Sequence, residues 1–146
     1  MEKLLISSCL VGVASRYDGA SKPSLSDEQI EKLMEKYELV PFCPEIYGGL
    51  PTPRIPSERI LDKVMMRDGT DVTKNYQKGA DETLKLSRLF GIKKALLKEK
   101  SPSCGVNGIY DGSFTGALTD GMGVAAELLV KNGIEVFGES EIDKLL

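Results

Sequence analysis

The sequence predicts one α/β domain, residues 1–146, built as a three-layer doubly wound sheet that is mostly parallel, with helices on both faces and small β-hairpin insertions. The chain has the length of a single domain, with 41% hydrophobic residues, and no repeat, linker or low-complexity tract divides it. Short apolar runs typical of strands also alternate with longer stretches of helical periodicity. This alternation is typical of flavodoxin-like and Rossmann-like folds.

The first strand and the first helix are expected near the amino terminus. Leu4–Ser8 is a short apolar run that ends at Cys9, as a buried strand would. Ser26 and Gln29 have the spacing of a capping box, which predicts a helix directly after Ser26. The face of this helix that we expect to be buried carries Ile30, Leu33, Met34 and Tyr37.

The middle of the chain is expected to hold a second strand, a proline-rich loop and a long helix. Leu39–Phe42 is a second short apolar run. Pro51–Ser57 contains three prolines, which block both strand pairing and helix, so we expect an ordered loop or a lid there. Arg67–Thr70 resembles the turn of a β-hairpin between the runs that flank it. The long helix is expected to be capped by Thr73, to run to about Phe90 and to stop at Gly91.

The remaining elements complete the sheet and its cover. Lys94–Lys98 is the third expected strand, and Ile109–Thr115 carries the Asp-Gly pair typical of a second hairpin. The final elements are a helix from after Asp120 to Asn132, a fourth strand at Ile134–Phe137 and a short helix capped by Ser140.

Each of the three cysteines follows one of the first three expected strands. Cys9, Cys43 and Cys104 are far apart in the sequence, but each lies directly beyond a strand or in the loop that follows it. The carboxyl ends of parallel strands meet at one edge of a sheet, where ligands bind in such folds. We therefore expect the three thiols to converge into one metal or cluster site.

Composition excludes several classes of function. The formal net charge is only −3, and Lys and Arg are spread along the chain, so we expect no polymeric nucleic acid partner. Only three strongly apolar residues precede Ser7, too few for a signal peptide or a membrane span, so we expect a cytoplasmic protein. Histidine is absent, which excludes Ser-His-Asp triads, Cys-His nucleophile pairs and Cys2His2 zinc sites within this chain.

Three cysteine thiolates are compatible with two kinds of metal site. Three thiolates suit a zinc ion with water in its fourth position, and they also suit a four-iron four-sulfur cluster with one iron lacking a protein ligand. The chain has no Cys-x-x-Cys pair, the usual sign of a zinc ribbon. This absence favours the cluster.

Polar residues close to the second and third cysteines are candidates for catalysis. Glu45 lies two positions beyond Cys43, where its carboxyl group could act as general acid or base. Ser101, Ser103 and the backbone of Gly105 could orient a substrate. The candidates for binding an anionic or planar ligand are Arg16 and Arg54. The glycines do not form a dinucleotide fingerprint, so we expect no nicotinamide site.

Three segments of the chain together resemble a known bacterial family. The first combines Cys9–Gly12 with Arg16–Gly19, the second combines Cys43–Glu45 with Gly48–Arg54, and the third is Ser101–Gly105. Their residues, order and spacing are similar to those of the domain-of-unknown-function 523 family, which includes the thiouracil desulfurases, also called desulfidases. The resemblance covers nearly the whole chain.

The resemblance implies an enzyme that depends on a [4Fe-4S] cluster and removes sulfur from a thiolated nucleobase or a related small heterocycle without redox chemistry. It places the cluster ligands at Cys9, Cys43 and Cys104, with the fourth iron open for the substrate sulfur. It also implies active-site roles for Glu45, which would activate water, and Ser101, which would position the ring. Hydrosulfide would be released.

Two other classes of function remain as alternatives. One is a non-catalytic module that carries or senses an iron-sulfur cluster or persulfide sulfur, and the other is a zinc hydrolase with three cysteine ligands. The physiological substrate, the oligomeric state and any movement of the Pro51–Ser57 loop stay open at this point.

Overall fold

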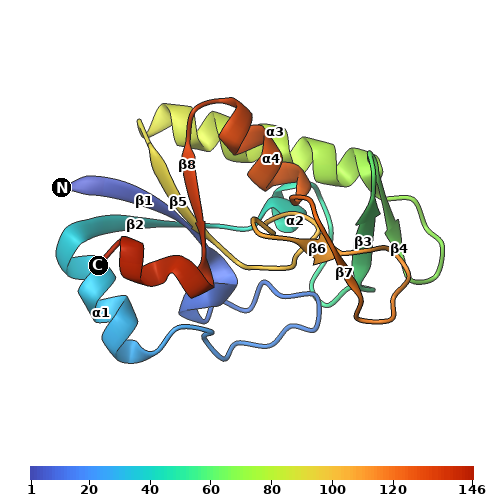
Figure 1. Ribbon diagram of the computed structural model, residues 1–146, viewed down its shortest axis with the longest axis horizontal. Coiled ribbons are helices and arrows are strands. Elements are labelled where there is room, and N and C mark those ends of the chain that lie inside the picture. The colour runs from blue at the N-terminus through green and yellow to red at the C-terminus, as the bar shows by residue number, and fades with distance from the viewer.

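Four parallel strands form the central sheet, in the order β2–β1–β5–β8 (Figure 1). They are β1 (Glu2–Ser7), β2 (Tyr37–Phe42), β5 (Lys94–Leu97) and β8 (Glu135–Gly138). The structure, a computed structural model, describes residues 1–146. All four expected strands are present with slightly displaced ends, and the predicted doubly wound parallel class is confirmed.

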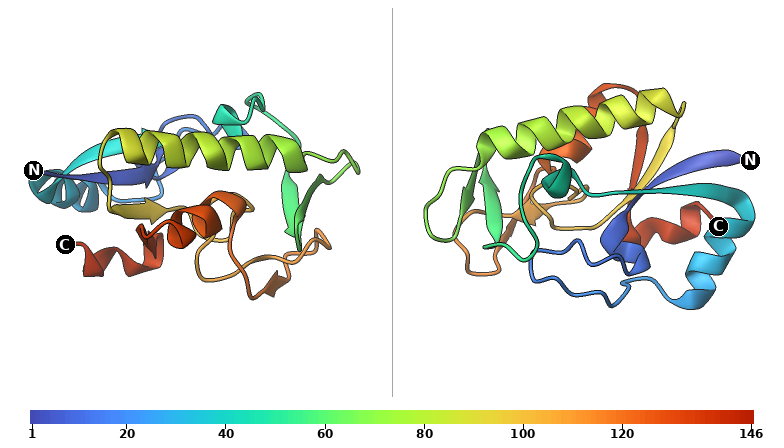
Figure 2. Two further views of the ribbon diagram at one scale, coloured as in Figure 1. Left: turned by 90° about the horizontal axis from the view of Figure 1, so that it is seen from above. Right: turned by 180° about the vertical axis from the view of Figure 1, so that it is seen from behind.

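Helices cover both faces of this sheet. They are α1 (Asp27–Lys36), α2 (Pro44–Tyr47), α3 (Thr73–Leu89) and α4 (Val124–Lys131), together with the short 3-10 helices η1 (Ser8–Val11) and η2 (Glu139–Lys144). Helices α3 and α4 pack on one face and α1 and η2 on the other, which the two turned views of Figure 2 display. No helix combines the length and the apolar character that crossing a bilayer requires.

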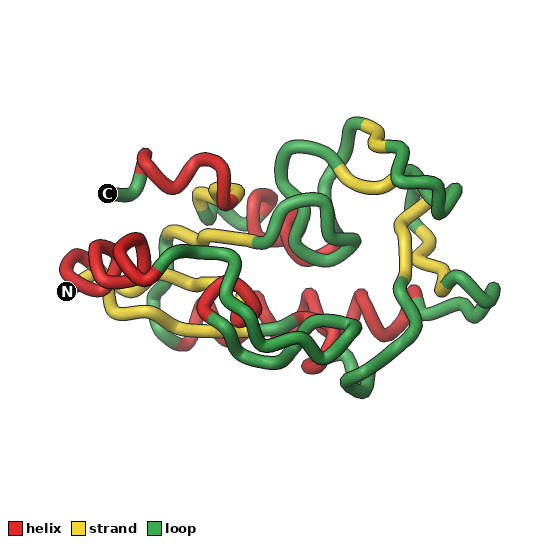
Figure 3. The backbone as a smooth tube through the Cα atoms, turned by 90° about the horizontal axis from the view of Figure 1, so that it is seen from below, coloured by secondary structure: helices red, strands yellow, loops and turns green.

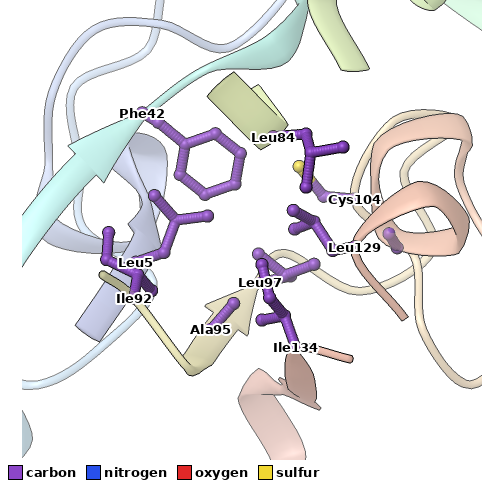
Figure 4. Packing of buried hydrophobic residues seen from close by; sticks show 10 residues of the cluster. Leu5, Phe42, Leu84, Ile92, Ala95, Leu97, Cys104, Leu129 and Ile134 are labelled. Carbon is purple, nitrogen blue, oxygen red and sulfur yellow. The ribbon is translucent and has the colours of Figure 1, made fainter. Parts of the chain in front are cut away.

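The sheet divides the core around it into two halves, and a third, smaller cluster lies where α3 meets β4 (Lys63–Met66). Successive side chains of a strand point to opposite faces, so β1 and β5 contribute to both halves. Leu5 and Leu97 belong to the cluster shared with α3 and α4, which Figure 4 shows. Leu4 and Leu96 belong to the cluster shared with α1 and η2. Burial on both faces explains why these strands are continuous apolar runs.

Two hairpins extend the domain beyond the carboxyl edge of the sheet. They consist of β3 (Ser57–Ile60) with β4 (Lys63–Met66) and of β6 (Ile109–Tyr110) with β7 (Leu118–Thr119). Figure 3 shows their strands at the end of the molecule opposite the two termini. The expected β-hairpin insertions are therefore present.

The pairing within these hairpins differs from the sequence-based expectation. The turn at Arg67–Thr70 exists, but the main partner of β4 is β3, and after the turn only Asp71 bridges back, to Met65. The second hairpin does not close within Ile109–Thr115, because its return strand comes later, at Leu118–Thr119. In both cases the turn was correctly located and the pairing strand was not.

Helices α1 and α3 confirm one prediction and correct two others. The capping box is present, with Ser26 Oγ accepting from Gln29 N at 3.1 Å and Gln29 Oε1 accepting from Ser26 N at 3.0 Å. Met34 is 58% exposed, so its assignment to the buried face of α1 was wrong. Thr73 is the first residue of α3 rather than its cap. Its N–H donates to the Asp71 carboxylate at 2.9 Å.

The last helix also begins differently from the expectation. Ser140 lies inside η2, and it is the Glu141 side chain that accepts the Gly138 N–H, at 3.1 Å. Ser140 instead donates its N–H and its hydroxyl to the Glu99 carboxylate, each at 2.8 Å. These bonds attach η2 to the loop that follows β5.

Candidate active site

The three cysteines lie at the carboxyl edge of the sheet and line one cavity of about 500 Å³. Cys9 is in η1, directly after β1, and Cys43 stands between β2 and α2. Cys104 is in the turn-rich loop after β5. The structure thus brings together the three thiols that the sequence places after separate strands.

All three thiols are free, and all three have a raised pKa. Burial is the main cause, and it raises the pKa of Cys9 to about 11, with a further contribution from the nearby Cys43. Burial also raises the pKa of Cys104, which packs among Phe42 and Leu84 (Figure 4). The negative charges that Cys9 and Cys43 would carry as thiolates raise the pKa of Cys104 further. The three sulfurs therefore lie within electrostatic range of one another.

The three thiols do not form a site for a single metal ion. No group of three or more Cys, His, Asp or Glu side chains is arranged to hold a single metal ion. Around one zinc ion, with bonds of about 2.3 Å, thiolate sulfurs would lie about 4 Å apart. In a four-iron cluster each thiolate binds a different iron, so the sulfurs lie farther apart.

Glu45 enters the cavity from the first turn of α2 and is held at both carboxylate oxygens. Arg54 Nε donates to Oε1 at 3.0 Å, and Ser103 Oγ donates to Oε2 at 2.9 Å. The Glu45 carboxylate also contributes to the strongly raised pKa of the buried Tyr76 hydroxyl, after the larger effect of burial. Glu45 is therefore fixed by groups from two other loops.

Helix α2 is placed by an unusually close approach to α3. A Cβ atom on Gly79 would stand 1.9 Å from the carbonyl oxygen of Pro44, and one on Gly48 would stand 2.0 Å from that of Asn75. Asn75 Nδ2 also donates to the Gly48 carbonyl at 2.9 Å. Because α2 begins immediately after Cys43, this contact sets the position of both Cys43 and Glu45.

The two serines of the third motif form a chain that leads to Glu45. Ser101 Oγ accepts from the N–H groups of Ser103 and Cys104, both at 3.1 Å, and lies 3.0 Å from Ser103 Oγ. Since Ser103 donates its single hydroxyl proton to Glu45, its oxygen is left to accept from Ser101. Ser103 thus contacts Glu45 directly, whereas Ser101 reaches it through Ser103.

The amino end of α4 holds this serine loop in place. Val124 N donates to the carbonyl of Pro102 at 2.8 Å, and Ala125 N donates to that of Ser103 at 3.0 Å. Gly105 accepts from Gly123 N at 2.8 Å and donates its own N–H to Ser101 O at 2.9 Å. Gly105 does not line the cavity, so the backbone that we expected to face a substrate is used within the fold.

The two candidate arginines occupy different environments. Arg16 lines the cavity with its side chain 35% exposed and pairs with Asp18 at 3.3 Å. Arg54 also lines the cavity, but its side chain is only 3% exposed and its guanidinium is bound to protein groups on every side. Arg16 is thus the more available of the two.

Part of the cavity lining was not predicted from the sequence. Its side chains come from α3, the hairpins and the end of β5, and include Glu58, Arg67, Tyr76, Lys98, Tyr110 and Phe114. The buried Glu58 carboxylate accepts the N–H groups of Gly112 and Phe114, at 2.9 and 3.1 Å, and the Arg67 guanidinium lies 5.7 Å from the centre of the Phe114 ring. The Asp-Gly signal locates this turn in the sequence but does not indicate that it lines the same cavity as the cysteines.

Comparisons with known proteins agree along almost the entire chain. Residues 4–141 match the family model described as 2-thiouracil desulfurase. The uncharacterized protein YbbK of Bacillus subtilis (strain 168) is 39% identical over 153 residues, covering 98% of this chain and 99% of the relative. The solved structure of the [4Fe-4S]-dependent thiouracil desulfidase TudS (DUF523Vcz) superposes with a TM-score of 0.93 at 44% identity, covering 99% of this chain and 95% of that one.

Proposed function

The chain belongs to the 2-thiouracil desulfurase family, and from that premise we propose that it is a [4Fe-4S]-dependent enzyme that removes sulfur from a thiolated pyrimidine such as thiouracil. The observation that carries the proposal is the single cavity in which three free thiols stand beside a carboxylate fixed at both oxygens. The solved relative, named as a thiouracil desulfidase, supports the same chemistry.

Cys9, Cys43 and Cys104 have the chemistry needed to hold the cluster. Thiolates are the usual ligands of iron-sulfur clusters, and the positive irons would offset the burial that raises all three thiol pKa values. Backbone N–H groups at the start of α2 lower the pKa of Cys43, against the larger effect of burial, and such donors also stabilise ligating sulfur.

The chain offers the cluster three thiolates for four irons. It has no fourth cysteine and no histidine, so one iron is left without a ligand from either residue type. When bound, the cluster would supply a Lewis-acidic iron that binds the substrate sulfur and polarises the carbon–sulfur bond.

The protein's own groups would manage water and protons. Glu45 would take a proton from the water whose oxygen attacks the thiolated carbon, and would return it to the departing sulfur. One water is consumed: its oxygen replaces the sulfur, one of its protons leaves with the sulfur as hydrosulfide, and the other is released to solvent, without net oxidation or reduction. Ser101 would hold the ring, while Ser103 and Arg16 complete the polar surroundings of the substrate.

The test is sulfide release by protein reconstituted with iron and sulfide under anaerobic conditions. We expect 2-thiouracil or 4-thiouracil to yield uracil and hydrosulfide in equal amounts. Iron and acid-labile sulfide counts, with the optical spectrum, separate the cluster from zinc. A protein that carries the cluster and releases no sulfide from any of a panel of thiolated bases would contradict the proposal.

A Glu45→Gln variant distinguishes the enzyme from a cluster carrier. The carboxylate is needed to move protons, whereas the amide has nearly the same shape and leaves the three thiols in place. We expect the variant to keep its iron and lose most of its turnover. Unchanged function with a full cluster would favour the carrier or sensor alternative.

A further inference from the structure

Four of the five N–H groups of the Arg54 guanidinium donate to the protein. Nε donates to Glu45, Nη1 donates to Pro51 O at 3.2 Å and to Thr52 Oγ1 at 3.0 Å, and Nη2 donates to Ser15 O at 2.8 Å. A guanidinium has five N–H groups in a rigid fork, so these bonds leave little capacity for a ligand. With 3% of its side chain exposed, Arg54 is part of the wall behind Glu45.

These bonds connect the segments that surround the first two cysteines. The Arg54 backbone N–H donates to Tyr17 O at 2.7 Å, so both main chain and side chain attach to the loop that follows η1. Within that loop, Ser15 Oγ lies 2.6 Å from Ser8 Oγ, and Ser8 directly precedes Cys9. The Cys43 sulfur is also 3.8 Å from the Ser15 carbonyl. Arg54 therefore joins the loops of Cys9 and Cys43 to the carboxylate that it binds.

We infer that Arg54 is a positioning residue for desulfurisation: it fixes Glu45 in its reacting orientation and aligns the Ser15–Tyr17 loop, and it does not bind the substrate. The inference rests on the proposed function, since it assigns the geometry of that reaction's acid-base group. Ser103 holds only Oε2, so without Arg54 the carboxylate can rotate about its side-chain bonds. An ammonium group cannot reproduce the fork, because its charge sits at a single nitrogen.

Two substitutions separate positioning from substrate binding. In the cluster-loaded enzyme, we expect Arg54→Met to lower kcat by about 10- to 100-fold with little change in KM, because misplacing a catalytic group costs turnover rather than affinity. Arg54→Lys, which keeps the charge and is the milder change, should recover part of the loss. Iron content and optical spectrum should match those of the wild type in both variants.

Arg59 supplies a matched control. Like Arg54 it is mostly buried and pairs with a carboxylate, Glu127, at 2.7 Å, but it does not line the cavity. Arg59→Met should leave kcat and KM unchanged. An Arg54 variant whose KM rises tenfold or more while kcat holds would make Arg54 a substrate ligand, and equal loss of iron and kcat would make it a purely structural residue; either result overturns the inference.

A second measurement does not depend on activity. In the metal-free protein, Arg54→Lys should accelerate amide hydrogen exchange about tenfold in residues 13–19 and 44–50 and leave β3 and β4 unchanged. Unchanged exchange in those two segments would refute the positioning role even if the wild type released no sulfide. A wild type without activity, combined with the expected exchange pattern, would count against the proposed function alone.

Discussion

The three thiols differ in depth although they line the same cavity. Cys104 is buried in the hydrophobic core, whereas Cys9 and Cys43 are half-buried. Cys104 therefore has two roles, as a core residue and as a candidate ligand. Ser101 and Ser103 stand beside it without being candidate ligands, which allows metal binding and catalysis to be tested separately.

Replacing any one of the three cysteines with serine should deplete iron and abolish sulfide release. A hydroxyl is a much poorer ligand than a thiolate for cluster iron, and the chain has no fourth cysteine and no histidine to take its place. Iron and labile sulfide per protein are the measurements, with circular dichroism as a check on folding. A Cys43→Ser protein with full iron content would remove Cys43 from the ligand set.

Ser103→Ala should weaken turnover while keeping the cluster. The variant removes the only serine hydroxyl that donates to Glu45, and it leaves Oε2 without that bond. We expect kcat to fall about tenfold or more, in line with the loss of one hydrogen bond to a charged group. Ser101→Ala is the companion variant, expected to keep iron and to weaken turnover through loss of ring positioning. A Ser103→Ala enzyme with wild-type kcat would show that the contact with Glu45 is dispensable.

The candidate residues of the cavity are more visible in the sequence than the groups that support them. Cysteines and a glutamate directly after strands are visible in the sequence because parallel strands share an edge. The bonding of Arg54 is not visible, since only the fold brings Ser15, 39 positions away in the sequence, against the guanidinium. The same limit applies to Gly105, whose backbone is used by the loop and by α4.

The contact between α2 and α3 depends on glycine and can be tested directly. Inside an ordinary helix, Gly→Ala stabilises by up to about 1 kcal/mol. At Gly79 the added Cβ would collide with the Pro44 carbonyl, so we expect Gly79→Ala to destabilise the protein by about 1–3 kcal/mol and to lower its iron content. Urea unfolding and iron analysis measure the two effects. Lys78→Ala, at an exposed neighbouring position of α3, should change neither; a stabilised Gly79→Ala protein would contradict the close approach.

The attachment of η2 should depend on pH through Glu141. Hydrogen bonds from Lys144, Asn107 and the Gly138 N–H lower its pKa from 4.5 to about 2. A carboxyl group with a lowered folded-state pKa stabilises the fold above its unfolded pKa of about 4.5, and that stability is lost as the pH falls toward 2. Urea midpoints of the metal-free wild type and Glu141→Gln should therefore differ above pH 4.5 and converge near pH 2. A difference that grows toward acid pH would exclude this role.

Elements stabilised by local bonds were the ones predicted well. The capping box of α1 lies within four consecutive residues, so its pattern could be recognised without the fold. Ser140 was misassigned because its partner, Glu99, lies on the loop after β5 and could not be anticipated locally. The strands β3 and β7 were missed for a similar reason, since neither is marked by a local pattern and each is identified only by its pairing in the fold.

The whole domain should become more stable when the cluster binds. Its three candidate ligands come from the connections after β1, β2 and β5, so a bound cluster joins loops that are far apart in the chain. Binding to the folded state alone stabilises it by mass action, and we expect a gain of about 3 kcal/mol or more. Anaerobic urea unfolding before and after iron chelation measures this. Cys104→Ser should show no difference between the two preparations; equal midpoints for the wild type would argue against a shared ligand site.

The overall class was predictable because the periodicity of strands and helices suffices to specify a parallel three-layer sheet. The cavity was only half predictable. Its cysteine-bearing side follows from the strand ends, whereas the opposite side is built by hairpins whose packing is a property of the complete fold. Glu58 and Phe114 belong to that second side.

The order of the ligands along the chain has a consequence for biosynthesis. Ribosomes deliver the amino end first, and domains generally fold as units once their core is available. The loop carrying Cys104 is held by the N–H groups of Val124 and Ala125, which are translated after it, and β8, the neighbour of β5, emerges later still. The nascent chain therefore cannot present all three positioned thiols until the residues through β8 have left the exit tunnel. If these thiols hold the proposed cluster, we expect its delivery to follow assembly of the sheet.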